Sequence, residues 1–397
     1  MEFFVVSLLK IAIVFAVLMT TLAYLQWIER KVLAHIQLRV GPQRVGPHGL
    51  LQPVADVIKL ATKEGVIPPH VNTFFYILAP ILAVGLALIS IVVIPFGPNV
   101  PVPFLGGRTN MELTNINIGV LFVLAISSVG VYGIALGGWA SNNKYSLMGG
   151  LRSSAQMISY ELPMSIALAT PLLALNTLNF REIVEKQGGF AFGFIPQWTV
   201  FQFPPLLLVA FLVFLISAFA ETNRVPFDLP EAENELVAGF HTEYSSLAFA
   251  SFFMAEYANM ITVTCVAATL FLGGWQPLIP GVAGNYVPSL LFFGGSAVLL
   301  FHGLTQPFRK WDRYTFPFFG LVFGVIGLIF LIPALQPYLV PIFWFASKVG
   351  VLLFIFIWIR GTLPRFRYDQ LMKFTWTFLF PVAMGILTLT ALWVALT

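Results

Sequence analysis

The chain has 397 residues, of which 58% are hydrophobic and 10% are charged. Soluble globular domains carry about a quarter charged residues, so this composition excludes that class and predicts an integral membrane protein. The formal net charge of +4 does not indicate nucleic-acid binding, because the cations occur in short loops between apolar segments. The single cysteine, Cys265, cannot form a disulfide within the chain or supply a cysteine-ligated iron–sulfur cluster alone.

Ten apolar segments are long enough to cross a bilayer, which requires about 20 helical residues. They cover residues 3–28, 73–96, 116–138, 155–178, 201–220, 245–272, 287–304, 316–334, 338–359 and 378–396. No connection between them has room for a soluble domain with its own core. The sequence therefore predicts an all-α polytopic membrane protein that forms a single membrane domain over residues 1–397.

The distribution of cations predicts how the chain is oriented. Connections that share a face with the loop after the first segment contain 16 of the 21 Lys and Arg residues, whereas the opposite connections contain only Arg108, Arg181 and Lys186. Cytoplasmic loops of membrane proteins are enriched in cations. We therefore expect the cation-rich face to be cytoplasmic and both termini to lie outside.

The first cytoplasmic loop, residues 29–72, is predicted to contain a helix that lies in the membrane interface. After two Gly-Pro turns at residues 41–42 and 46–47, apolar residues recur at helical spacing within residues 49–64. Such a helix is too short to cross the bilayer. It is either a surface anchor or the frame of an opening through which an amphiphile enters from the lipid. Residues near that opening would be Glu29, Arg30, Arg39, Asp56 and Lys59.

Two acidic residues and two lysines fall inside predicted spans. Glu256 and Lys348 are near the middle of theirs, Glu161 lies about 9 Å into its span, and Lys10 is shallower. Ionisable groups are costly in a bilayer, so each is a functional hypothesis. The alternative is a structural ion pair with a neighbouring helix, which we favour for Lys10.

An acidic loop, residues 221–244, joins two apolar spans on the predicted cytoplasmic face. It contains one cation, Arg224, and six of the chain's 17 carboxylates, namely Glu221, Asp228, Glu231, Glu233, Glu235 and Glu243. One interpretation is structural, with Asp228 capping a short helix whose first turn holds Glu231 and Glu233. The alternative is a proton or charge reservoir, because crowded carboxylates raise one another's pKa toward neutrality.

Several motifs of soluble enzymes are absent. The sequence has no glycine-rich phosphate loop, no nucleotide-binding fingerprint and no metal-ligand spacing among its five histidines. We therefore expect no metal site, no catalytic residue acting alone and no electron transfer by this chain alone.

Two long motifs resemble one known family. PFDLPEAENELVAGFHTEY, residues 226–244, resembles the signature loop of the membrane-embedded H subunit (subunit 1 in mitochondrial naming) of respiratory complex I, the type I NADH:quinone oxidoreductase. GLLQPVADVIKLATKE, residues 49–64, is similar to the second signature of that family. Shorter matches occur at residues 29–31, 39–47 and 357–372, so the resemblance extends over the whole chain.

The resemblance implies a subunit of a proton-translocating enzyme of a bacterial inner membrane. Such a subunit forms much of the tunnel for its quinone substrate and links quinone reduction to proton translocation. Flavin and iron–sulfur clusters would belong to partner subunits. The implied partners are hydrophilic redox-arm subunits at the cytoplasmic loops, small membrane subunits and antiporter-like membrane subunits.

The resemblance also implies roles for individual residues. Those expected to bind quinone are Glu29, Arg30, Arg39, Asp56, Lys59 and Phe227. Those expected to couple quinone reduction to proton movement are Glu161, Glu221, Asp228, Glu231, Glu233, Glu235, Glu243 and Glu256.

Two departures from the family pattern affect the expected architecture. The family core has eight spans, so residues 286–334 are expected to form an inserted helical hairpin. Ala238 and His241 stand where small polar residues are expected. Three other functions remain open: a homologous subunit of a hydrogenase-type or other electron-donor complex, a stand-alone proton-coupled transporter, and a structural anchor.

Overall fold

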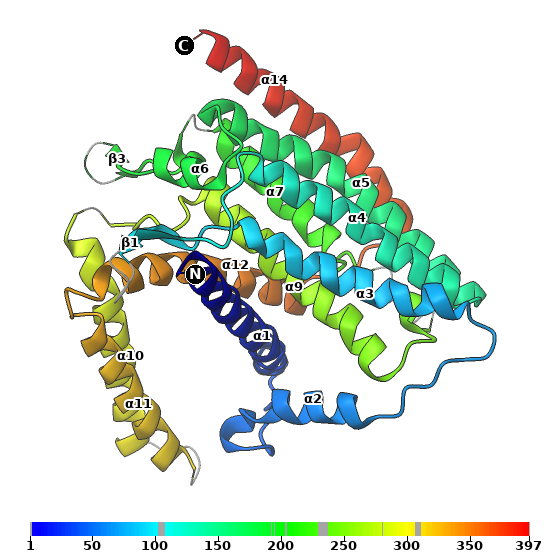
Figure 1. The fold of residues 1–397 in the computed structure, drawn as a ribbon, viewed down its shortest axis with the longest axis horizontal. Coiled ribbons are helices and arrows are strands. Elements are labelled where there is room, and N and C mark those ends of the chain that lie inside the picture. The colour runs from blue at the N-terminus through cyan, green and yellow to red at the C-terminus, as the bar shows by residue number, and fades with distance from the viewer. Residues whose placement is uncertain are drawn as a thin grey trace.

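The computed structural model describes residues 2–101, 108–191, 193, 195–202, 205–228, 237–279, 281–305 and 311–396, and helices dominate it (Figure 1). The α-helices are α1 (Glu2–Ile36), α2 (Gln52–Thr62), α3 (Thr73–Ile89), α4 (Gly119–Ala140), α5 (Lys144–Leu175), α6 (Phe180–Lys186), α7 (Leu206–Glu221), α9 (Ser246–Phe271), α10 (Ala283–Thr305), α11 (Asp312–Ile329), α12 (Gln336–Thr362), α13 (Tyr368–Phe374) and α14 (Phe380–Leu396). A π-helical turn, Thr375–Leu379, joins α13 to α14.

The described residues also include short 3-10 helices and two small antiparallel ribbons. β1 (Gly97–Pro101) pairs with β2 (Arg108–Met111), and β3 (Phe190–Ala191) pairs with β4 (Ile195–Pro196). The ribbons and α6 lie at one end of the bundle, which we call the ribbon face. The opposite end holds α2 and the ends of residues 221–244, and we call it the α2 face (Figure 1).

The predicted fold class is confirmed. Within the described ranges, nine helices are long and apolar enough to cross a membrane, and α7 is a further apolar helix of 16 residues. Each of the ten predicted spans overlaps one of these helices. α1 and α5 contain 35 and 32 residues, more than the predicted apolar segments, because their polar ends continue as helix beyond the hydrocarbon. The assignment of the α2 face to the cytoplasm stays a prediction.

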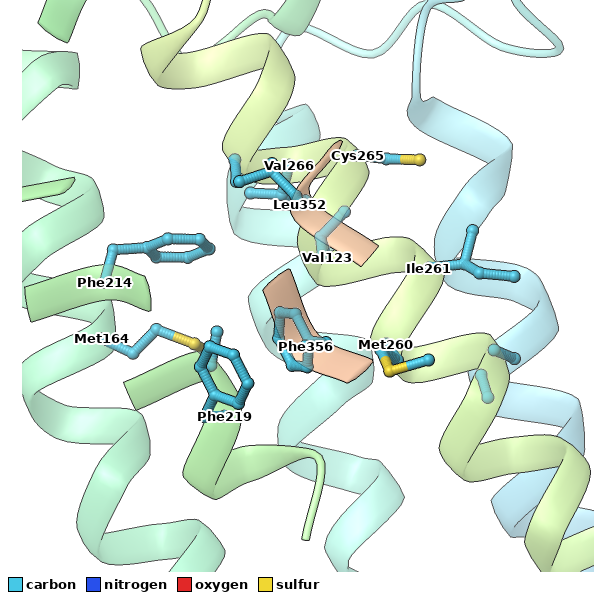
Figure 2. Close-up of a cluster of buried hydrophobic side chains, with 14 of the residues drawn as sticks. Val123, Met164, Phe214, Phe219, Met260, Ile261, Cys265, Val266, Leu352 and Phe356 are labelled. Carbon is cyan, nitrogen blue, oxygen red and sulfur yellow. The ribbon is translucent and has the colours of Figure 1, made fainter. Parts of the chain in front are cut away.

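α9 is the central helix of the bundle. In its most apolar stretch, 78% of residues are buried, and Figure 2 shows its side chains in one hydrophobic cluster with those of α7 and α12. Phe219 of α7 stacks on Phe356 of α12 with ring centroids 3.7 Å apart. Residues carried by α9 therefore have little freedom to move.

Small residues allow helices to approach closely. A Cβ on Gly133 of α4 would lie 3.0 Å from the backbone nitrogen of Ala83 in α3. A Cβ on Gly138 would lie 2.6 Å from the carbonyl oxygen of Ser146 in α5. Both α3 and α5 thus pack directly on the backbone of α4.

Lys348, which the sequence places in the middle of a span, closes the carboxyl end of α9. Its ammonium group donates to the carbonyl oxygens of Leu272, Gly274 and Gln276 at 2.6, 2.8 and 2.7 Å. It also lies 4.1 Å from the ring centroid of Trp198. A cation at a helix carboxyl end satisfies carbonyl groups that have no partner within the helix. This geometry supports a structural role for Lys348.

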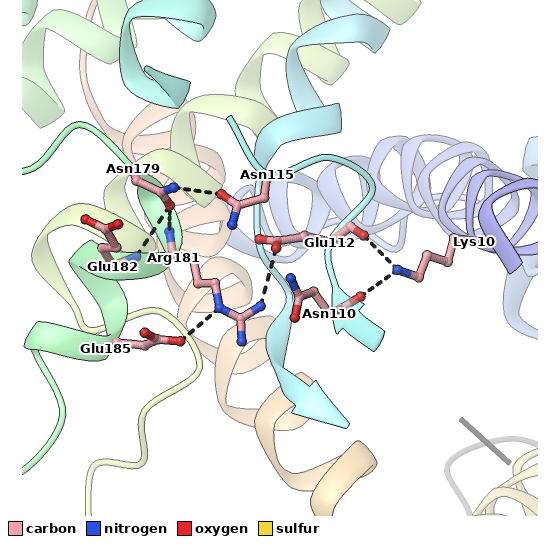
Figure 3. A network of polar contacts seen from close by, with 8 residues as sticks. All are labelled: Lys10, Asn110, Glu112, Asn115, Asn179, Arg181, Glu182 and Glu185. Carbon is pink, nitrogen blue, oxygen red and sulfur yellow. Dashed lines mark hydrogen bonds and ion pairs between the residues drawn. The ribbon is translucent and has the colours of Figure 1, made fainter. Parts of the chain in front are cut away.

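A polar network on the ribbon face holds α1, a helix that is mostly exposed in this structure (Figure 3). Lys10 donates to the carbonyl oxygens of Asn110 and Glu112 at 2.8 and 3.3 Å. Arg181 lies 3.3 Å from the Glu112 carboxylate and 2.9 Å from that of Glu185. Burial raises the pKa of the Glu112 carboxyl, and the charge of Arg181 acts in the opposite direction.

α10 and α11 form an antiparallel hairpin beside α12 (Figure 1). The Ser296 hydroxyl of α10 donates to the carbonyl oxygen of Gly320 in α11 at 2.7 Å. At the ribbon-face end, Phe330 clusters with Val340 and Trp344 of α12. That this hairpin is an addition to an eight-helix core stays a prediction.

Replacing Arg181 by Met is expected to lower the thermal midpoint of the purified protein in detergent. The change leaves the Glu112 carboxylate, only 4% exposed, without its cation, which costs about 3 kcal/mol. Arg367→Met is the matched control, since its pair with Asp369 is 78% and 68% exposed and contributes less than about 1 kcal/mol. Equal midpoints for the two variants would contradict this account of the network.

Candidate functional site

Glu29 lies at the α2-face end of α1, and three other segments hold its carboxylate. It is 3% exposed and accepts a hydrogen bond of 2.8 Å from the Tyr257 hydroxyl of α9. Arg360 of α12 forms an ion pair with it, and Arg224 lies 3.4 Å away. Donors from three segments therefore converge on this buried carboxylate.

Arg224, from the start of the acidic loop, joins Glu29 to Glu256. Its second terminal nitrogen lies 3.7 Å from the Glu256 carboxylate. Its guanidinium carbon lies 4.1 Å from the centroid of the Tyr257 ring, which is a favourable position for a cation. The other Glu256 oxygen lies 3.9 Å from Nε2 of His241. We call Glu29, Arg224, Glu256, His241 and Arg360 the central charge cluster.

Gln156 of α5 fixes the backbone that carries Arg224. Its side chain is fully buried, and its amide nitrogen donates to the carbonyl oxygens of Ala220 and Phe227 at 2.7 Å each. The two acceptors lie on opposite sides of Arg224 in the sequence. A single amide therefore sets the shape of the turn between α7 and the rest of the acidic loop.

The next residues of the loop are held by the connection between α12 and α13. Arg365 donates to the Asp228 carboxylate at 2.9 Å. The Phe227 ring is 7% exposed and stacks on that of Phe366, with centroids 5.6 Å apart. Phe227 is thus a packed residue in this conformation. Asp228 is compensated by an arginine.

Two adjacent serines of α4 bind two of the predicted coupling acids. The Ser127 hydroxyl donates to Glu221 at the end of α7, and the Ser128 hydroxyl donates to Glu161 of α5. A cavity of about 60 Å³ reaches Ser127, Glu221 and Glu256. A water molecule needs about 10–15 Å³ of such space and two or more polar partners, so the cavity can hold water between these acids.

A separate group of charges lies where α1 meets α2. Arg30 of α1 donates to the Asp56 carboxylate of α2 at 2.7 Å, and Lys59 lies 4.0 Å from the same carboxylate. Arg39 is exposed in the following loop. On α2, Val54, Val57 and Ile58 are 49%, 59% and 57% exposed. An amphipathic helix that presents these side chains is suited to the membrane interface, and its position there stays a prediction.

Glu243 belongs to neither group. Its carboxylate accepts a hydrogen bond of 2.7 Å from Asn143, and its carbonyl oxygen accepts one of 2.7 Å from Tyr76. Tyr244 beside it stacks on Tyr76 at 4.2 Å, and burial raises the pKa of the Tyr244 hydroxyl. The other predicted coupling residues, Glu231, Glu233 and Glu235, lie outside the residues that the structure describes.

Sequence reasoning missed the residues that connect the acids. Arg224 was visible as the one cation in the acidic loop, and Arg360 lies in one of the matched motifs. Gln156 and Tyr257 carry no such signal. The role of a polar residue in an apolar span becomes clear only when the helix or loop that it contacts is known.

Comparison with known proteins identifies the family. A family profile described as NADH dehydrogenase matches residues 9–391. The H 1 subunit of NADH-quinone oxidoreductase from Solibacter usitatus (strain Ellin6076) is 63% identical over 397 residues, covering 100% of this chain and 98% of the relative. The chain belongs to this family. The H 2 subunit from Koribacter versatilis (strain Ellin345) is 47% identical over 405 residues, with 99% and 98% of the two chains covered.

Membership of this family defines the chain at a coarse level. It is a membrane protein and a subunit of an NADH-quinone oxidoreductase, and it is not an enzyme by itself. Other subunits must therefore accompany it.

Arg224→Met is expected to lower the thermal midpoint of the purified oxidoreductase. Loss of the cation between two buried carboxylates costs about 3–5 kcal/mol. Arg224→Lys should fall between Met and the native residue, because it keeps the charge but lacks the planar fork. Tyr257→Phe is the variant for comparison, and its midpoint should fall less, since it removes one hydrogen bond to the Glu29 carboxylate, worth about 1.5–3 kcal/mol, and keeps the ring. A native midpoint in Arg224→Met would show that the cluster does not depend on this cation.

Proposed function

We propose that this subunit forms much of the quinone-binding tunnel and couples quinone reduction to proton translocation through buried carboxylates. One observation carries the proposal. A series of contacts runs from Glu29 at the α2 face, through Arg224, to Glu256, which borders a cavity shared with Glu221. Ionisable groups therefore continue from the α2 face into the bundle.

The quinone enters from the bilayer beside α1 and α2. Arg30, Asp56 and Lys59 supply polar groups there, next to the exposed aliphatic face of α2. Such a boundary suits a ligand with a polar head and an apolar tail. Arg39 lies in the adjoining loop. Phe227, held between Tyr160 and Phe366, borders the path only after the loop changes conformation.

Coupling follows from the proton demand of quinone reduction. A quinone takes up two protons with its two electrons, and the electrons come from flavin and iron–sulfur subunits that dock on the α2 face. Removal of protons near Glu29 leaves negative charge there, which favours proton uptake by Glu256 and Glu221. At an effective dielectric constant of about 20, two unit charges 4 Å apart interact by about 4 kcal/mol. An interaction of this size moves protons along the series.

Each acid has a specific place in the proposed pathway. Glu256 and Glu221 exchange protons across the cavity, and Ser127 and Ser128 connect Glu221 to Glu161 along α4. Charge then passes to antiporter-like membrane subunits. Asp228 and Glu243 take part through the loop, and we assign the same role to Glu231, Glu233 and Glu235.

Glu256→Gln is expected to reduce proton pumping and quinone reduction about tenfold, the effect of raising a barrier by about 1.4 kcal/mol. NADH oxidation by a soluble acceptor such as ferricyanide should be unchanged, because that reaction bypasses the quinone. Glu185→Gln is the matched control, since Glu185 is 53% exposed on the ribbon face. Native pumping in reconstituted vesicles of the Glu256→Gln enzyme would refute its role in coupling.

Asp56→Asn is expected to raise the KM for quinone about two- to tenfold with a small change in kcat. It removes the charge that pairs with Arg30 and Lys59 and thereby alters the opening. Because the opening is remote from the reacting quinone head group, its contacts are the same in the ground state and the transition state, so their loss raises KM and leaves kcat nearly unchanged. Glu64→Gln, an exposed acid just beyond α2, serves as the control. Steady-state kinetics that show the same KM in both variants would argue against an opening beside α2.

A further inference from the structure

The loop before α2 is tied to the α10–α11 hairpin by His48. Its Nε2 lies 2.7 Å from the Thr315 hydroxyl and 3.5 Å from the Asp312 carboxylate, both at the start of α11. Its ring stacks on Phe316 with centroids 5.4 Å apart and an angle of 7°. Three contacts from the first turns of one helix thus converge on one imidazole, across 267 positions of sequence.

The backbone of the loop is shaped to present His48. Gly46, His48 and Gly49 all have positive φ, at 73°, 54° and 76°. A Cβ on Gly49 would lie 2.5 Å from the carbonyl oxygen of Pro42, so the turn folds tightly on itself. A histidine in the left-handed region is conformationally costly. The contacts with α11 compensate for that cost.

The hairpin is itself anchored far from this loop. The Trp344 indole of α12 donates to the carbonyl oxygen of Gly284 at 3.1 Å, near the start of α10. Asp312 at the other end of the hairpin is 4% exposed, which makes its contact with His48 a buried one. The outward side of α11, including Leu321 and Leu328, is 63% and 58% exposed. The hairpin therefore extends from α12 to the loop before α2. Figure 1 shows the start of α11 beside that loop.

We propose that the α10–α11 hairpin holds the quinone opening in a fixed geometry through its contacts with His48, which is the positioning residue. We call this arrangement of hairpin and His48 the bracket. The loop that holds His48 leads directly into α2, which carries Asp56 and Lys59. Fixing the loop fixes the start of α2 relative to α1 and its Arg30. This inference rests on the proposed quinone site and extends it to a segment that does not border the opening.

His48→Ala is expected to raise the KM for a ubiquinone analogue about two- to twelvefold at unchanged kcat, the range for loss of one hydrogen bond. His48→Gln should restore most of the native KM, because its amide reaches the same Thr315 and Asp312 groups. His35→Ala is the matched control, since the exposed His35 ring bonds to the Lys31 carbonyl oxygen of its own helix. NADH oxidation by ferricyanide reports that each variant is assembled.

A cross-link provides a readout independent of activity. His48→Cys combined with Thr315→Cys, treated with a short bis-maleimide, should give a cross-linked peptide by mass spectrometry, whereas His35→Cys with Thr315→Cys should not. The cross-linked enzyme should keep the native KM.

Absence of the His48–Thr315 cross-link, or a native KM in His48→Ala, overturns the bracket. If His48→Ala is native and Asp56→Asn is impaired, only the bracket fails; if both are native, the proposed quinone opening fails as well.

Discussion

The structure depends on how one arginine compensates two carboxylates that are both out of water. Glu29 lies near the end of α1, a helix that is exposed along most of its length, and Glu256 lies in α9, whose most apolar stretch is 78% buried. Isolated charges in such places cost several kcal/mol each. Arg224 contacts both, although it is 195 positions from Glu29 in sequence, and Arg360 adds a second cation. The cluster therefore joins α1, the acidic loop, α9 and α12 at one point.

The rest of the fold fixes α9 and the turn that carries Arg224 more firmly than it fixes α1. α9 is fixed by core packing and by Lys348 at its carboxyl end, and Gln156 sets the turn that carries Arg224. α1, in contrast, is mostly exposed, and it is held by Lys10 on the ribbon face, by the buried side chains of Leu18, Leu22 and Leu25, and by Glu29 on the α2 face. In the function that we propose, the fixed acid beside this exposed helix transmits charge inward after an amphiphile has entered beside α1.

Much of the fold could be predicted from the sequence, because the requirement that backbone groups be satisfied in lipid acts locally. Each predicted span and the amphipathic helix α2 are present. The site could be predicted only in part. The six carboxylates of the acidic loop all lie within residues 221–244. Nevertheless, Glu221 binds Ser127, Asp228 binds Arg365 and Glu243 binds Asn143. Their partners come from distant segments, and local pattern carries no information on such pairings. Lys10 and Lys348, expected in ion pairs or functional roles, donate to carbonyl oxygens instead.

In the function that we propose, a quinone binds between the α1–α2 opening and the central charge cluster. A photoreactive quinone with a short tail, irradiated in the intact oxidoreductase and mapped by peptide mass spectrometry, tests it most directly. The account predicts label on peptides that contain Glu29–Arg30 and Asp56, and competition by excess unlabelled quinone. Label confined to other subunits, or to the lipid-facing side of α11, would contradict it.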